Sequence, residues 1–457
     1  MRIRRLFTGS RGLAIAVAGL GLRPALVTPA AAADTPALRF DFGPGPVAPG
    51  YVRVLPDATY DAATGYGFEP GANLEGVDRG GGDPLRGDFV AGAQPFFFFV
   101  KVPEEGNWRV TVTLGDAAGA STATIKAELR RLMVENLHTA PGEFRTVTFL
   151  VNTRTPTIAA AHGVAAGEVR LKAPRESIQE GWAWDDRITL EFDPGPAGRV
   201  CVDAIEVAKA TVPTIYLLGD STVCDQSREP YTSWGQMLTR FFKPEVAIAN
   251  HAESGETCRD SIGRRRLGKI LSVIQPGDYL FMQFGHNDQK QIAAGTGGPF
   301  TTYKAEIRTH VDAVRARGGI PVIVSPMERR KFDAAGKIQP TLADYAEAAR
   351  QAAQELNVAF IDLHAMSIPF YEALGPEKSK FAFAKPAPGR VDDTHQDSYG
   401  AYELAKCVVQ GIRDDRLEIA KYITDDFTGF DPAHPDPVGQ FDVPPSPLGT
   451  AEKPFGN

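Results

Sequence analysis

The hydrophobic pattern of the chain changes near residue 210, and this change limits the folds open to it. Residues 38–208 carry short runs of alternating apolar and polar residues, such as 108–114, separated by turns rich in Gly, Pro and Asp. Such alternation is typical of strands with one buried face, so we expect an all-β sandwich over 34–210. Beyond residue 213, strands alternate with helices instead. We therefore place a domain boundary between 210 and 211.

The second half, 211–423, has the pattern of an α/β domain. The expected strands are 214–218, 245–250, 279–284, 321–325 and 359–363, and the expected helices include 301–317, 342–356 and 399–412. Strands that alternate with helices imply a parallel sheet covered on both faces, which is a three-layer, flavodoxin-like architecture. In such a domain the functional site lies at the carboxyl ends of the strands. Catalytic residues should therefore come just after strands.

The first 33 residues have the composition of an export signal. Four arginines precede an apolar run at 13–22, and three alanines at 31–33 offer a cleavage site. The run is too short to serve as a membrane anchor, because a spanning helix needs roughly 20 apolar residues. Arg4 and Arg5 also fit a twin-arginine signal, with an ordinary basic region as the alternative. We expect a secreted or periplasmic protein.

Charge and the carboxyl-terminal composition add two further expectations. Without residues 1–33 the chain has 44 basic and 56 acidic residues, a net charge of −12, which argues against a nucleic-acid partner. A local arginine cluster remains compatible with a polyanionic substrate. The tail, 424–457, holds seven prolines and no periodicity. We expect it either to wrap across the surface through Phe427, Phe430 and Phe441 or to be disordered, and we favour wrapping.

Short polar blocks follow three of the predicted strands, and a fourth block precedes the last predicted helix. The blocks are 219–222 (Gly-Asp-Ser-Thr), 250–255 (Asn-His-Ala-Glu-Ser-Gly), 285–288 (Gly-His-Asn-Asp) and 392–395 (Asp-Asp-Thr-His). Each block alone would suit a turn or a helix cap. Together they hold a serine, a histidine and aspartates, which are the groups a serine nucleophile needs for its activation.

In this order the four blocks resemble those of the SGNH, or GDSL-like, hydrolase superfamily. The resemblance covers 211–423 and implies a serine esterase with Ser221, Asp392 and His395 as its catalytic triad. It also implies an oxyanion hole made of the backbone N–H groups of Ser221 and Gly255 and the side-chain amide of Asn287. Glycine suits this position because the missing Cβ allows close approach.

Two residues compete with the triad assignment. Asp393 is closer to His395 in sequence and is the competing orienter, although the family spacing favours Asp392. His364 follows the fifth predicted strand and is the rival base. The chain has no GxSxG elbow and no HExxH, EF-hand or P-loop pattern. We therefore expect no metal and no cofactor.

The chain has four cysteines, Cys201, Cys224, Cys258 and Cys407, which allow three full pairings in an exported protein. The resemblance brings Ser221 and Gly255 to one oxyanion. Cys224 and Cys258 each lie three residues further along the chain. A Cys224–Cys258 disulfide is therefore a reasonable hypothesis.

Within the superfamily the sequence is most similar to the rhamnogalacturonan acetylesterases, which deacetylate the galacturonate-rich backbone of pectin. The similarity rests on 219–222, 283–288, 325–332 and 393–402. Arg329, Arg330 and Lys331 could pair with a galacturonate carboxylate, or they could form a solvated turn or pair with nearby acids. Glu256 stands where family members commonly carry small or basic residues, so acetylated xylan stays open as a substrate.

The amino-terminal sandwich resembles, more weakly, the galactose-binding-like domains attached to pectin-active enzymes. The resemblance rests on 40–46 and 64–68. A sugar-binding sandwich usually exposes aromatic side chains, for which the candidates are Tyr60, Tyr66, Trp182 and Trp184. The alternative is that these side chains belong to the core and that the domain shields or shapes the cleft.

We therefore expect a carbohydrate O-acetylesterase that acts on pectin through an acetyl-serine intermediate. Its partner would be an acetylated acidic polysaccharide or oligosaccharide, and we expect neither a nucleic acid nor a membrane partner. The enzymatic alternative is an esterase for acetylated xylan or another acyl ester, such as a lipase, thioesterase or arylesterase. The non-enzymatic alternative is a glycan-binding protein with a vestigial hydrolase domain, against which the intact Ser221, Asn287, Asp392 and His395 argue.

Overall fold

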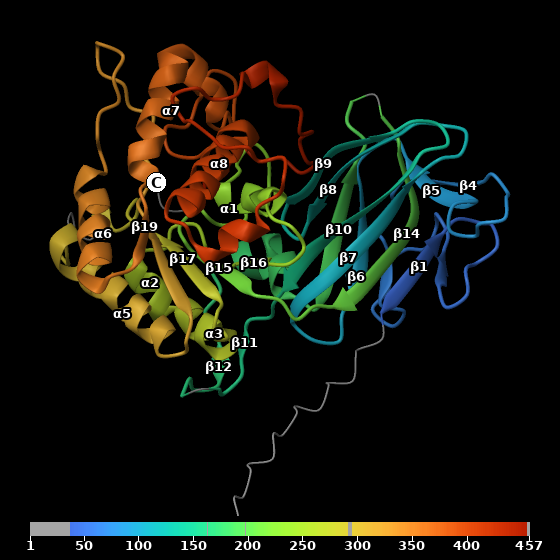
Figure 1. Cartoon of the computed structure of the whole chain (residues 1–457), viewed down its shortest axis with the longest axis horizontal. Coiled ribbons are helices and arrows are strands. Elements are labelled where there is room, and N and C mark those ends of the chain that lie inside the picture. The colour runs from blue at the N-terminus through green and yellow to red at the C-terminus, as the bar shows by residue number, and fades with distance from the viewer. Residues whose placement is uncertain (1–36, 162, 197, 291–294, 455–457) are drawn as a thin grey trace, which may run out of the picture. The chain divides into compact units, whose positions relative to one another are not determined.

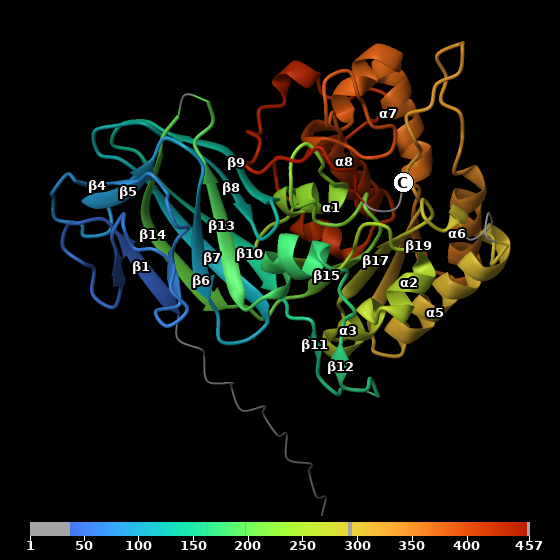
Figure 2. The same ribbon diagram turned by 180° about the vertical axis from the view of Figure 1, so that it is seen from behind.

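The computed structural model describes residues 37–161, 163–196, 198–290 and 295–454, so the predicted export signal at 1–33 lies outside the described residues. The described residues of both halves belong to one compact unit. Figures 1 and 2 show the β-rich half beside a half in which helices surround a sheet. The fold class is the predicted one, an all-β sandwich followed by a three-layer α/β domain.

The sandwich has two largely antiparallel sheets. The first has the order β10 (Phe144–Thr153), β7 (Gly106–Gly115), β14 (Val200–Lys209), β1 (Leu38–Phe42) and β2 (Val52–Val54), with β5 (Asp88–Gly92) on β14 and β4 (Glu75–Asp78) on β5. The second has the order β3 (Tyr66–Phe68), β6 (Phe96–Lys101), β13 (Arg187–Asp193), β8 (Ser121–Ala127) and β9 (Arg131–Thr139).

Alternating side chains build the core between these sheets. On β7, Trp108, Val110 and Val112 are buried, while the residues between them are partly exposed. The ring of Phe98 on β6 packs edge-on against aromatic rings from β1 and β3. On the outer face of β6, Phe97 and Phe99 contact Trp182, which explains why this strand is apolar on both sides.

The α/β domain is built on a parallel sheet. Its order is β16 (Ala247–Asn250), β15 (Thr214–Gly219), β17 (Tyr279–Gln283), β18 (Ile320–Val324) and β19 (Ala359–Ile361). One face packs on α1 (Trp234–Met237), α7 (Leu363–Lys378) and α8 (Ser398–Asp414), and the other packs on α3 (Arg266–Val273), α5 (Lys304–Arg315) and α6 (Ala343–Leu356). Successive strand residues alternate between the faces, as Ile215 and Tyr216 do. Among the described residues, no helix has the length and apolarity required to cross a membrane.

Shorter elements connect these layers. They are β11 (Thr157–Ile158), β12 (Gly167–Glu168), α2 (Cys258–Gly263), η1 (Arg175–Gln179), η2 (Gly181–Trp184), η3 (Leu238–Phe241), η4 (Pro299–Tyr303), η5 (Ser379–Ala382), η6 (Glu418–Tyr422) and η7 (Val438–Gln440).

The two domains are joined by buried ion pairs. Arg131 at the start of β9 lies 2.8 Å from Asp225 of the α/β domain. Arg266 on α3 pairs with Glu176 on η1, and both side chains are fully buried. Removing one partner of such a pair leaves an uncompensated buried charge, which costs about 3 to 5 kcal/mol. The sandwich therefore supplies part of the neutralisation of the buried charges of the α/β domain.

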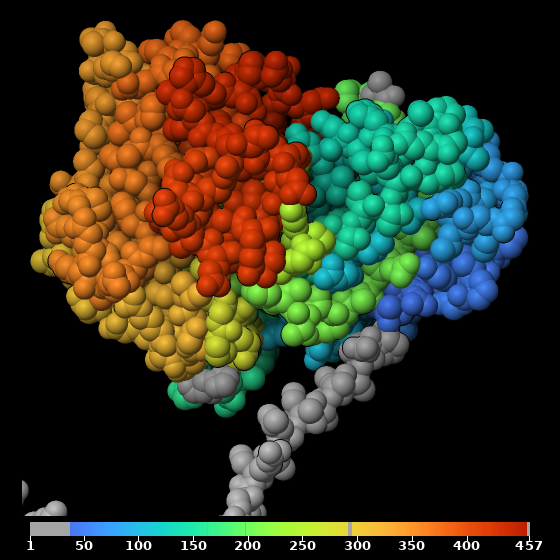
Figure 3. Space-filling view, viewed as in Figure 1, coloured from blue at the N-terminus to red at the C-terminus, as the bar shows by residue number. Residues whose placement is uncertain are grey.

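The tail wraps across the α/β domain through the expected aromatic residues. The ring of Phe427 packs edge-on against Phe241, and that of Phe441 packs against Tyr399 and Tyr402. Beyond Phe441 the chain crosses to the sandwich. In Figure 3 the last part of the chain, in red, forms one surface with the α/β domain, and its edge meets the teal strands of the sandwich.

The hypothesis of a Cys224–Cys258 disulfide is wrong. Both residues, like the chain's other two cysteines, are free and buried. Cys224 packs with the α1, α7 and α8 side of the sheet, whereas Cys258, which begins α2, packs with the α3, α5 and α6 side. Their turns start at neighbouring strands but run to opposite faces. The equal sequence spacing of the two cysteines from Ser221 and Gly255 therefore does not indicate that the cysteines are close in space.

Candidate active site

Ser221 lies in the turn after β15, at the carboxyl end of the parallel sheet. The turn is tight at Gly219, where a Cβ atom would lie 2.6 Å from the carbonyl oxygen of Gln283. Asp220 closes the turn by accepting hydrogen bonds from the N–H (3.0 Å) and the hydroxyl (2.7 Å) of Thr222. These contacts hold Ser221 at the edge of the sheet.

His395 reaches Ser221 from the loop that precedes α8. Its Nε2 lies 2.9 Å from Oγ of Ser221, and its Nδ1 lies 3.2 Å from Oδ2 of Asp392. The other oxygen of Asp392 accepts the backbone N–H groups of Thr394 (2.8 Å) and His395 (3.0 Å). The Asp-x-x-His spacing therefore forms a closed turn in which the carboxylate orients the imidazole.

Ser221, His395 and Asp392 form one hydrogen-bonded series, the catalytic series. Burial and neighbouring charges set the protonation states of His395 and Asp392. Burial alone would raise the pKa of Asp392, but the hydrogen bond and charge of His395 and two backbone donors outweigh it and lower that pKa. Burial lowers the pKa of His395, Asp392 opposes this effect, and the charge of Lys453 adds to the lowering. At neutral pH the imidazole is therefore uncharged and able to accept a proton.

The two rival residues make other contacts. The carboxylate of Asp393 accepts the hydroxyl of Thr394 at 3.1 Å. His364 Nε2 lies 3.1 Å from Glu328, a buried carboxylate whose pKa would be raised by burial but is lowered to about 2 by hydrogen bonds from His364, Thr341 and the backbone. Within the described ranges, no group of three or more His, Cys, Asp and Glu side chains is placed to hold a metal ion.

The second and third blocks lie against the first. The N–H of Glu253 donates to the carbonyl of Gly219 at 3.0 Å, and the side-chain amide of Asn287 donates to the carbonyl of Glu256 at 3.1 Å. Gly255 has a φ of +73°, a conformation that favours glycine. The structure therefore brings together Ser221, Gly255 and Asn287, as well as Asp392 and His395.

Glu256, the residue that departs from the family pattern, is fully buried. Its carboxylate lies 2.8 Å from Lys172 and 3.3 Å from Arg264. Lys172 also donates to the carbonyl of Ser254, immediately before Gly255. A lysine of the sandwich domain thus supports the loop that carries Gly255.

A second sandwich residue connects to the nucleophile. The Arg175 guanidinium donates to the side chain of Gln226 at 3.0 Å, and Gln226 donates to the carbonyl of Ser221 at 2.7 Å. Sequence reasoning missed both Lys172 and Arg175. Lys172 precedes the short element η1 and Arg175 begins it. This part of the sequence has no periodicity and no motif, so no signal in the sequence could have identified them.

Arg329, Arg330 and Lys331 follow β18, as predicted. Arg329 is half-buried and donates to the hydroxyl of Thr341 (3.1 Å) and to the carbonyl of His286 (3.4 Å). Arg330 lies 5.9 Å from the ring centroid of Phe383, and Lys331 is exposed. Within the part of the chain described, none of the three pairs with a carboxylate. The side chain of Arg329 reaches the residue before Asn287, and the backbone N–H of Arg330 donates to the carbonyl of Asp393, next to Asp392, at 2.8 Å.

The aromatic candidates for sugar binding in the sandwich are packed against other rings. Trp184 is buried, and its indole N–H donates to Glu176 at 3.2 Å. Trp182 covers Phe97 and Phe99, while Tyr60 packs on Phe99. Tyr66 packs on Phe40.

Two protein families match parts of the chain. Residues 217–385 match the GDSL-like lipase/acylhydrolase family, and residues 38–137 match the beta-agarase/YXIM esterase-like, galactose-binding domain-like family. The first match includes Ser221, Gly255 and Asn287 and ends before Asp392.

Individual relatives extend these matches. Rhamnogalacturonan acetylesterase RhgT of Bacillus subtilis (strain 168) is 38% identical over 219 residues, which are 46% of this chain and 93% of that protein. The uncharacterized esterase YxiM of the same organism is 27% identical over 398 residues, which are 84% of this chain and 92% of that protein. The crystal structure of YxiM from Bacillus subtilis aligns at 26% identity with a TM-score of 0.43, covering 84% of this chain and 99% of that one.

Proposed function

The chain belongs to the GDSL-like lipase/acylhydrolase family and is an esterase, and we propose that it removes acetyl groups from the rhamnogalacturonan of pectin. The observation that carries the chemistry is the hydrogen-bonded series from Ser221 through His395 to Asp392. The substrate is proposed because 46% of this chain matches 93% of a relative named rhamnogalacturonan acetylesterase RhgT.

In the first half of the proposed reaction, Oγ of Ser221 attacks the carbonyl carbon of the acetyl group while Nε2 of His395 takes the hydroxyl proton. Asp392 stabilises the imidazolium that results. The tetrahedral oxyanion is held by the N–H groups of Ser221 and Gly255 and by the amide of Asn287. Each such donor contributes about 3 to 4 kcal/mol.

In the second half the tetrahedral intermediate collapses. The C–O bond to the sugar breaks, the sugar oxygen takes the proton from His395, and acetyl-Ser221 remains. A water molecule, deprotonated by His395, then attacks the acetyl-enzyme, and acetate leaves as Ser221 regains its proton. The reaction needs no metal and no redox partner.

The preference for an acidic glycan is attributed to Arg329, Arg330 and Lys331. A guanidinium that lacks a protein carboxylate is available to a galacturonate carboxylate, and charge-assisted bonds of this kind are among the stronger ones. Arg329 is the leading residue of the three because of its contact next to Asn287. Residues 1–33 are proposed to direct export, so that the enzyme meets its polysaccharide in the periplasm or outside the cell.

Acetate release from acetylated rhamnogalacturonan, set beside release from acetylated xylan, tests the proposal. We expect a higher kcat/KM on rhamnogalacturonan. Ser221→Ala should release no acetate while keeping the wild-type thermal unfolding, and Ser272→Ala on α3 serves as the matched serine control. A preference for xylan would overturn the pectin assignment. Wild-type activity in Ser221→Ala would overturn the mechanism, whatever the substrate.

A further inference from the structure

A cleft of about 560 Å³ lies beside the catalytic series and has three separate walls. Residues 174–179 of the sandwich form one wall, residues 226–231 after Ser221 form the second, and residues 450–454 of the tail form the third. Its volume lies within the range of about 300 to 1,000 Å³ that is usual for ligand sites. None of these walls belongs to the four sequence blocks.

The cleft reaches the catalytic series through two side chains. The ring of Tyr231 packs edge-on against the imidazole of His395, with 5.7 Å between their centroids. Nζ of Lys453 lies 3.5 Å from Oδ2 of Asp392, and its side chain is 29% exposed. Both residues line the cleft. A ligand held there would therefore lie next to the group being deacetylated.

Tyr231 carries an unused polar group. The residue is 1% exposed, and its hydroxyl has no hydrogen-bond partner among the described residues. A buried hydroxyl without a partner costs roughly 1 to 3 kcal/mol, so such groups are normally satisfied by a ligand or by water. The residue that carries this hydroxyl lines the cleft.

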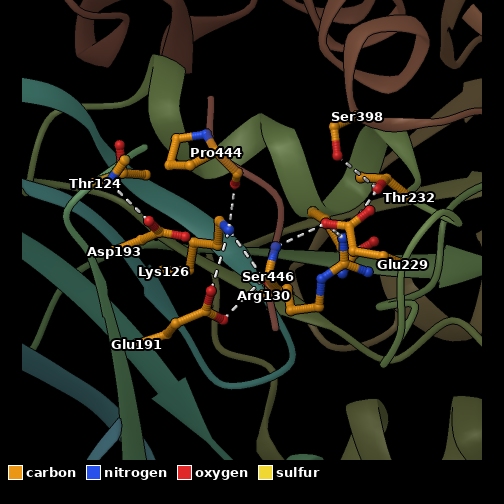
Figure 4. A network of polar contacts seen from close by, with 12 residues as sticks. Thr124, Lys126, Arg130, Glu191, Asp193, Glu229, Thr232, Ser398, Pro444 and Ser446 are labelled. Carbon is orange, nitrogen blue, oxygen red and sulfur yellow. Dashed lines mark hydrogen bonds and ion pairs between the residues drawn. The ribbon is translucent and has the colours of Figure 1, made fainter. Parts of the chain in front are cut away.

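The tail wall is fixed in place by a buried network. We define residues 442–454 as the C-terminal strap. Nζ of Lys126 on β8 donates to the carbonyl of Pro444 (2.8 Å) and the hydroxyl of Ser446 (2.9 Å), and it lies 3.1 Å from Glu191 on β13. Glu191 also accepts the Ser446 hydroxyl at 2.9 Å. Figure 4 shows Lys126 at the centre of these contacts.

A second anchor sets the position of the strap along the cleft. The N–H of Glu229 donates to the carbonyl of Leu448 at 2.8 Å, and the N–H of Thr450 donates to the carbonyl of Glu229 at 2.7 Å. The Glu229 carboxylate accepts the N–H of Ser446 at 3.0 Å and pairs with Arg130, as Figure 4 also shows. Lys453 therefore lies three residues after Thr450, whose backbone N–H is hydrogen-bonded to the carbonyl of Glu229.

The charges in the cleft favour an anion. The Arg175 guanidinium is neutralised by Glu180 and Glu253. Within the described residues, Arg228 is exposed and forms no ion pair, and the one ion pair of Lys453 is with the carboxylate of Asp392. Against these two cations the cleft carries one exposed acid, Glu452. A ligand with sugar hydroxyls and a carboxylate would satisfy both Lys453 and Tyr231.

We propose that this cleft is a glycan subsite for a uronate residue next to the acetylated sugar, with Lys453 of the strap as the group that binds its carboxylate and Tyr231 as a hydroxyl donor. The proposal rests on the proposed function and deepens it, because it makes the sandwich and the strap part of the substrate site. It assigns recognition of the uronate carboxylate to Lys453, which lies outside the residues 217–385 that match the GDSL-like family.

The test compares two versions of one substrate: acetylated rhamnogalacturonan oligosaccharides with free uronate carboxylates, and the same oligosaccharides with these groups reduced to alcohols. Lys453→Gln should lower the ratio of kcat/KM for the acidic over the reduced substrate by about 5- to 20-fold, as expected for a partly exposed charge-assisted contact. Lys378→Gln, an exposed lysine at the end of α7 with no ion pair in the described structure, is the matched control.

Because Lys453 contacts Asp392, binding must also be measured without catalysis. In the Ser221→Ala background, Lys453→Gln should raise Kd for the acidic oligosaccharide by a similar factor, and Tyr231→Phe should raise it for both oligosaccharides by roughly 5-fold. An unchanged ratio and an unchanged Kd in Lys453→Gln would overturn the proposal. If the wild-type protein does not deacetylate rhamnogalacturonan but Lys453→Gln still weakens uronate binding, the proposed substrate fails and the subsite stands.

Discussion

Replacing Lys172 with alanine should lower kcat with little change in KM. Nζ of Lys172 donates to the carbonyl of Ser254 and lies 2.8 Å from the buried carboxylate of Glu256. The peptide N–H of Gly255, an oxyanion donor in the proposed mechanism, lies between these two anchoring points. Without the lysine, the carbonyl of Ser254 and the carboxylate of Glu256 both lose their contact with Lys172 of the sandwich. The N–H of Gly255 then loses its fixed direction.

The magnitude follows from what remains after the substitution. Complete loss of one oxyanion donor costs about 10²- to 10³-fold in kcat. Glu256 keeps Arg264 at 3.3 Å and Arg266 at 3.8 Å, so the loop is loosened rather than released. We therefore expect a loss of about 10- to 100-fold in kcat. The remaining arginines also limit the loss of stability to about 1 to 2 kcal/mol, below the full cost of breaking a buried pair.

Hydrolysis of 4-nitrophenyl acetate, with thermal unfolding measured on the same samples, checks this prediction. Lys304→Ala on α5 is the control, because Lys304 has a similar exposure, 17% against 15%, and a similar distance to its partner, 2.6 Å against 2.8 Å. Lys172→Arg, which keeps the charge and the donors, should recover most of kcat. A Lys172→Ala variant with wild-type kcat, or an equal loss of kcat in Lys304→Ala, would refute the positioning role.

Three further predictions concern the catalytic series and the acidic substrate. Asp392→Asn should lower kcat by several powers of ten through loss of control over the tautomer of His395, whereas Asp393→Asn should have a small effect; the reverse result would reassign the orienter. Because the pKa of His395 is lowered from 6.5 and the base must be uncharged, the acidic limb of the pH profile of kcat/KM should lie below pH 6.5, and a limb above that value would contradict the assignment. Arg329→Ala should lower kcat/KM on acetylated rhamnogalacturonan by roughly 5- to 150-fold more than on 4-nitrophenyl acetate, and the difference should shrink with added salt; an equal loss on both esters would mean that Arg329 supports the fold.

The regular elements of the α/β domain could be predicted from the sequence because their burial is periodic. The strand expected at 214–218 is β15, and the helix expected at 301–317 is η4 followed by α5. The first three polar blocks could be placed because each follows a strand, and parallel strands bring their carboxyl ends to one edge. Local pattern and topology were sufficient for these features.

Features that depend on irregular segments could not be predicted in this way. Lys172 and Lys453 act on the site from positions without periodicity, and their partners are far away in the sequence. Glu256 stands out in the sequence as a departure from the family, yet the arginines and the lysine that neutralise it come from separate segments. The Cys224–Cys258 hypothesis failed because sequence spacing does not specify the face of the sheet toward which a turn runs.

The strap also has a consequence for the order in which the protein is made. Lys126 and Ser446 are 320 residues apart in the chain, and Asn136 and Asp442, which also hydrogen-bond, are 306 apart. Synthesis proceeds from the amino terminus, so the sandwich emerges long before the segment that it must hold. A chain still on the ribosome can have Ser221 and His395 in place while one wall of the cleft is not yet translated. The cleft is therefore completed only after both Ser221 and His395 have been synthesised.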